Sequence, residues 1–147
     1  MPLLSWEKDV IAIGYDLFLD GDLVGEIRNE RISNNSYVKI KDQKYFFESI
    51  GIGPKSINII DMIKRVKIGR VKFNALQSKV NITLLDEEYI WKPKNMLRNK
   101  WSIYSKNKEP ILDAKSFKSD SSSVDDESDL LLNFCGIITL LRLRLNG

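Results

Sequence analysis

The side chains most able to do chemistry in this chain are lysines and arginines. Five of them lie within residues 64–72, and four more lie around Trp91 and Trp101. Cations that share one face of a sheet attract anions such as phosphate-bearing lipid headgroups. The candidate anion-binding or lipid-binding residues are Lys64, Arg65, Lys67, Arg70, Lys72, Lys92, Lys94, Arg98 and Lys100.

Catalytic chemistry is restricted by what the sequence lacks. It contains no histidine and a single cysteine, Cys135. This composition excludes Ser-His-Asp and Cys-His nucleophiles, an intramolecular disulfide and a multi-cysteine zinc site. A carboxylate pair such as Asp86 and Glu88 resembles the pairs that any domain carries on its surface. We therefore expect no catalytic residue, metal or cofactor, and a protein that binds or scaffolds rather than an enzyme.

The charge is unevenly distributed along the chain. The net charge is only +3 over 147 residues, yet residues 62–108 hold 12 basic and 3 acidic side chains. If the strands that carry these cations pair as neighbours, they form one positive patch with aromatic side chains at its edge. An anionic membrane lipid or a protein is then the expected partner. The alternative is a solvated outer face whose lysines protect strand edges. Nucleic acid is disfavoured because no stacking motif is present.

The elements that must position these cations are strands. From residue 10 to residue 118, apolar residues alternate with polar ones, and turn residues recur every ten or so positions, which indicates an antiparallel meander of about ten strands. Asp20-Gly21 is a strong hairpin signal because glycine readily adopts positive φ. The apolar parity changes beside Gly69, which predicts a β-bulge or bend there.

The C-terminal part has a different pattern. Residues 119–128 are rich in serine and acidic residues and are predicted to be a linker, and residues 129–145 are predicted to be a helix. This helix is apolar on all sides and must therefore be buried on all sides. A sheet of about ten strands that curls into a barrel leaves an interior wide enough to hold it. Gly136 would allow a close approach to the barrel wall. We therefore predict a single domain, residues 1–147, of mainly β class, with a barrel around a C-terminal hydrophobic helix.

This arrangement resembles the tubby C-terminal-like superfamily, which includes the LURP-one-related proteins and the phospholipid scramblases. The resemblance rests on the pattern of residues 15–27, 68–71, 101–104 and 130–145. The family closes its barrel with twelve strands, whereas about ten are predicted here. An incomplete barrel is therefore an alternative to a closed one. The resemblance implies a phosphoinositide-binding, membrane-tethering module, with no motif that assigns its binding residues to positions in this sequence.

Two functions follow as hypotheses. The first is a non-enzymatic binding or tethering module of tubby-like type that recognises anionic lipid headgroups through a basic sheet face. The alternative is a β-barrel of lipocalin type that binds a small hydrophobic ligand, with the helix packed outside. The N-terminus lacks the features of a secretory signal, so a cytoplasmic protein, peripheral to the membrane, is expected.

Overall fold

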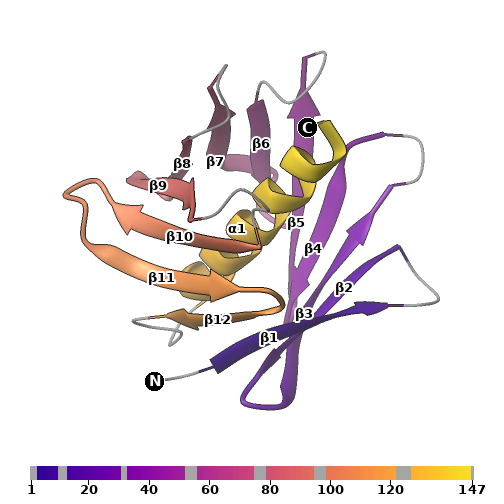
Figure 1. Cartoon of the computed structure of the whole chain (residues 1–147). Helices are drawn as coiled ribbons and strands as arrows, with labels where there is room; N and C mark the ends of the chain where they lie inside the picture. The colour runs from indigo at the N-terminus through magenta and orange to yellow at the C-terminus, as the bar shows by residue number, and fades with distance from the viewer. Residues whose placement is uncertain are drawn as a thin grey trace.

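Twelve strands and one helix make up the described part of this computed structural model (Figure 1). The structure describes residues 3–9, 13–30, 33–51, 56–74, 79–94, 99–121 and 127–146. The strands are β1 (Leu3–Asp9), β2 (Gly14–Leu19), β3 (Asp22–Asn29), β4 (Ser36–Ile40), β5 (Gln43–Ile50), β6 (Ser56–Asp61), β7 (Val66–Phe73), β8 (Val80–Leu84), β9 (Glu87–Pro93), β10 (Lys100–Ser105), β11 (Pro110–Lys115) and β12 (Lys118–Ser121), and the helix is α1 (Glu127–Asn146).

The sheet is a closed antiparallel barrel. Each strand pairs with its neighbours in sequence, and β12 pairs with β1 to complete the ring. The predicted β class, antiparallel order and barrel are confirmed, whereas about ten strands and an incomplete barrel are wrong. The two unpredicted strands are the ones that close the ring. One precedes residue 10, and the other falls largely within the predicted linker 119–128.

Both closing strands carry a weak sequence signal. In β1 only Leu4 and Trp6 are buried, so the alternation is too short to stand out. In β12 every side chain is polar, and Ser119 is the buried one among the described side chains. Backbone pairing with β1 on one side and β11 on the other makes β12 a strand.

Local sequence explains the turns and bends that were predicted. Asp20 and Gly21 have φ of 49° and 92°, the positive values that a tight hairpin requires. The β6–β7 register shifts beside Gly69, which confirms the predicted bulge. A Cβ at Gly69 would lie 2.4 Å from the carbonyl oxygen of Thr83, so only glycine lets the strands approach this closely.

The α1 helix occupies the interior of the barrel (Figure 1). It spans residues 127–146 rather than the predicted 129–145, and residues 130–143 are buried apart from the half-buried Leu141. Its side chains meet the wall on several sides. A Cβ at Gly25 of β3 would lie 2.8 Å from Phe134, and one at Gly136 would lie 2.3 Å from Trp101 of β10. The enclosure that the uniformly apolar sequence predicts is thus present.

Polar contacts fix the helix along the barrel axis. The barrel end with the turns at residues 20–21, 41–42, 62–65, 85–86 and 106–109 is called the proximal end below. There, the Tyr45 hydroxyl donates a hydrogen bond to Glu127 at 3.2 Å. Burial, together with the charge of Glu127, raises the pKa of Tyr45. At the opposite, distal end, Arg142 donates to Ser36 Oγ at 2.8 Å. The helix therefore begins at the proximal end and runs to the distal one.

Candidate anion-binding surface

The turn between β6 and β7 is held in one conformation by a buried carboxylate. Asp61 Oδ1 accepts hydrogen bonds from the backbone N–H groups of Ile63 and Lys64, both at 3.0 Å. The Asp61 carbonyl accepts from the Arg65 N–H at 2.8 Å, and Arg65 has φ of 58°. The backbone of the turn is thus bonded at three points, which defines the positions from which its side chains leave the surface.

The turn projects three apolar and three cationic side chains. Met62, Ile63 and Val66 are 40%, 56% and 48% exposed. Lys64, Arg65 and Lys67 lie between and beside them, and all three are exposed. We call residues 62–67 the β6–β7 tip. It combines water-exposed apolar surface with a local charge of +3, counting its own side chains.

The cations continue along the outer face of β7. Arg70 and Lys72 are exposed and alternate with the buried Val71 and Phe73. The strand partners of Arg70 are the neutral Asn58 and Thr83, and Arg70 Nε lies 3.5 Å from Asn58 Oδ1.

None of the five cations in residues 64–72 forms an ion pair with any acidic residue in the described part of the chain. An incoming anion therefore has no described carboxylate to displace. These five cations are Lys64, Arg65, Lys67, Arg70 and Lys72.

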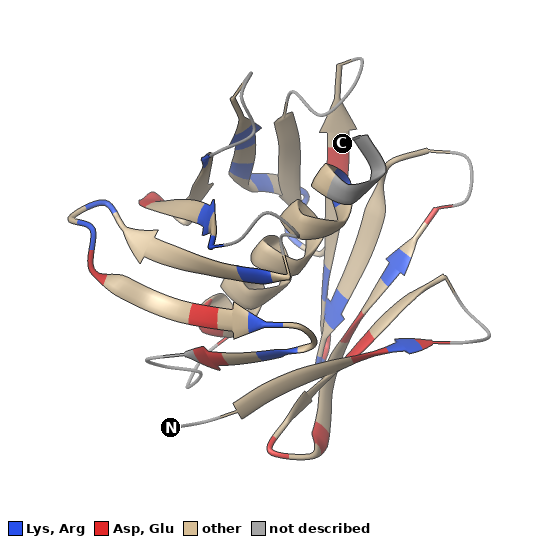
Figure 2. Ribbon diagram, viewed as in Figure 1, with Lys and Arg blue, Asp and Glu red and all other residues tan. Residues whose placement is uncertain are grey.

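The second predicted group of cations lies elsewhere. Lys92, Lys94 and Lys100 are at the distal end, and β8 separates their strands from β7. Figure 2 shows the basic segments spread over β7, β9 and β10. Arg98 lies outside the described residues. The condition set for a single patch, that these strands pair as neighbours, is not met, because β8 lies between β7 and β9.

Two members of this second group already have partners. Lys94 Nζ lies 2.8 Å from Asp113 Oδ1, and Ser102 donates a short hydrogen bond to the same oxygen. The bond from Lys94 and that from Ser102 hold the pKa of Asp113 below its ordinary value. Lys92 Nζ lies 5.9 Å from the centre of the Tyr104 ring, within the range of a cation–π contact.

Two lysines that lie beside Lys100 were not among the residues predicted from the sequence. Lys100, Lys115 and Lys118 are direct partners on β10, β11 and β12, so three like charges face one another on the outer surface. Only the strand register brings them together. The apolar members of the β6–β7 tip were also missed, although the run Met62-Ile63 within a charged turn is visible in the sequence.

The opposite side of the barrel is acidic. Arg28 Nη2 lies 3.2 Å from Asp9, 2.9 Å from Asp16 and 2.9 Å from Glu26. One guanidinium therefore faces three carboxylates on β1, β2 and β3, and Figure 2 shows acidic segments on this side. In the ring of strands, β7 lies across from β1. The molecule is polarised, and an anionic surface is directed toward β7.

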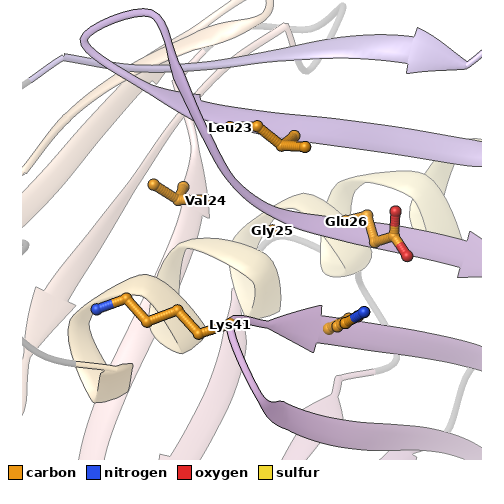
Figure 3. Close-up of a pocket in the computed structure, with 6 residues that line it drawn as sticks. Leu23, Val24, Gly25, Glu26 and Lys41 are labelled. Carbon is orange, nitrogen blue, oxygen red and sulfur yellow. The ribbon is translucent and has the colours of Figure 1, made fainter.

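A surface hollow of about 260 Å³ lies near the proximal end between β3 and β4. Figure 3 shows Leu23, Val24 and Gly25 on one side and Lys41 on the other, with α1 behind them. Its one carboxylate, Glu26, is bound to Arg28, so the hollow offers no free acid–base pair. The lining residues are Leu23, Val24, Gly25, Glu26, Lys39 and Lys41.

Comparison with protein-family models, curated proteins and solved structures gives no match for this chain. Within the described residues, no helix has the length and apolar character needed to cross a bilayer. In that same part of the chain, the cysteine, aspartate and glutamate side chains form no group of three or more that could hold a metal ion.

Proposed function

We propose that this protein is a non-enzymatic binding or tethering module that recognises anionic lipid headgroups at a membrane surface. The observation that carries the proposal is the group of five exposed cations in residues 64–72, without ion-pair partners in the described part of the chain. Each basic residue close to an anionic bilayer contributes about 1 kcal/mol of attraction. In this role the protein would be cytoplasmic and peripheral to the membrane.

The charge distribution supports a defined orientation. The acidic cluster around Arg28 is repelled by an anionic surface, whereas β7 on the other side of the barrel is attracted to it. The barrel with an internal helix also agrees with what the tubby-like resemblance implies, and membership of that superfamily is part of the proposal. The lipocalin-type alternative needs an open interior, which α1 occupies, so no observation favours it.

Vesicle co-sedimentation tests the proposal. The wild-type protein should pellet with phosphatidylcholine vesicles that contain about 30% phosphatidylserine, and not with phosphatidylcholine alone. The double variant Lys64→Glu/Lys67→Glu should bind the anionic vesicles about 30-fold or more weakly, because it loses at least two cations of about 1 kcal/mol each.

A second double variant, Lys115→Glu/Lys118→Glu, changes the net charge by the same amount in the group that these lysines form with Lys100, and so distinguishes that group from the cations of residues 64–72. It should retain most of the binding if the site is local. Equal pelleting of the wild type with neutral and anionic vesicles, or pelleting with neither, contradicts the proposed function. An equal loss in both double variants would show that only the overall charge matters.

A further inference from the structure

We propose that the β6–β7 tip inserts Met62 and Ile63 into the boundary between headgroups and acyl chains of an anionic bilayer. This inference rests on the proposed function and specifies how the protein sits on the membrane. The backbone bonds to Asp61 fix the turn, so the exposed apolar side chains are held out by the fold. Little ordering is then needed on binding.

The tip differs from other places where large apolar side chains are exposed. Leu85 is 50% exposed, but it precedes the acidic run that starts at Asp86. Leu23 is 62% exposed but follows the exposed Asp22, whereas the Asp61 that precedes Met62 is buried. Phe117 is half exposed and packs against the rings of Trp6 and Tyr15. The tip instead places its apolar side chains beside cations.

This combination fits the chemistry of a membrane interface. Within about 5–10 Å, an anionic bilayer offers both phosphate and carboxylate groups and the start of the hydrocarbon region. Lys64, Arg65 and Lys67 can keep their charges at the level of the headgroups because long cationic side chains bury their stems and extend their heads toward water. Two large apolar side chains then leave water. Attraction and insertion therefore act at the same turn.

The test is the double variant Met62→Ser/Ile63→Ser in the vesicle assay. Its affinity for vesicles with about 30% phosphatidylserine should fall about 10-fold or more, because apolar surface no longer leaves water. The variant should keep the preference for anionic over neutral vesicles. The ratio between wild type and variant should also persist as NaCl rises from about 0.05 to about 0.2 M, since salt screens charges and not apolar transfer.

Leu85→Ser is the matched control, because it removes an exposed leucine from a neighbouring proximal turn. It should bind like the wild type, and urea unfolding should show that all variants are folded. If the wild type binds anionic vesicles and Met62→Ser/Ile63→Ser binds them equally well, insertion is wrong and the proposed function stands. If the wild type binds no anionic vesicle, insertion and the proposed function are both wrong. An acidic protein surface then becomes the binding partner to test.

Discussion

A chain without residues 129–147 will not fold cooperatively. In the structure this segment supplies the interior of the barrel, and the apolar side chains from Leu130 to Leu143 that are fully buried include Phe134, Ile137 and Ile138. Burial of each large apolar side chain contributes roughly 1.5–3 kcal/mol. The sum over the helix exceeds the net stability of a typical domain, about 5–15 kcal/mol. Urea unfolding followed by circular dichroism should show no sigmoidal transition.

The control retains the helix and truncates one side chain that is only half-buried. Leu141 is half-buried, so Leu141→Ala in the full chain should lower the unfolding midpoint and leave a single cooperative transition. A truncated chain that unfolds in one cooperative step with a near-native near-ultraviolet spectrum would contradict the enclosed helix. That result is the one expected of a helix packed outside an open barrel.

Replacing Gly136 by alanine will destabilise the protein. In an exposed helix this change stabilises by up to about 1 kcal/mol, because alanine has the higher helix propensity. Here the new Cβ would lie 2.3 Å and 2.4 Å from ring carbons of Trp101. That ring is fully buried, with its centroid 6.3 Å from Trp6 and 6.0 Å from Trp91, so it has little room to move. We expect a loss of about 1–3 kcal/mol, and a larger one for Gly136→Leu.

A double-mutant cycle isolates the contact between position 136 and the Trp101 ring. Trp101→Phe removes the ring carbons that the new Cβ would meet, so Gly136→Ala should cost less in the Trp101→Phe background than in the wild type. The measurement is the free energy of urea unfolding for the four proteins. A stabilising Gly136→Ala, or two costs that simply add, would show that the helix does not press against this part of the wall.

Much of the fold follows from local sequence. The Asp20-Gly21 turn, the bulge beside Gly69 and the apolar helix each depend on a few neighbouring residues, and each was predictable. Closure of the barrel was not predictable from local sequence. It depends on β12, whose polar residues carry no apolar alternation, and on its pairing with β1 across the whole length of the chain.

For the candidate site, the sequence predicts which cations are present but not how they are arranged. The cations of residues 64–72 and those around Trp91 are both evident in the sequence, but their relative placement depends on how many strands intervene and at which end each turn lies. The strand β8 lies between β7, which carries part of the first group, and β9, which carries part of the second. Register also brings Lys100, Lys115 and Lys118 face to face, which no local pattern indicates.

The most direct measurement of the central claim is the environment of position 63 at a membrane. Ile63→Cys can be labelled selectively with a polarity-sensitive fluorophore, because the native Cys135 is fully buried. We predict a blue shift with vesicles that contain about 30% phosphatidylserine, none with phosphatidylcholine, and none for labelled Leu85→Cys with either vesicle. Protein that pellets with the anionic vesicles while the label at position 63 stays in a watery environment would contradict the account.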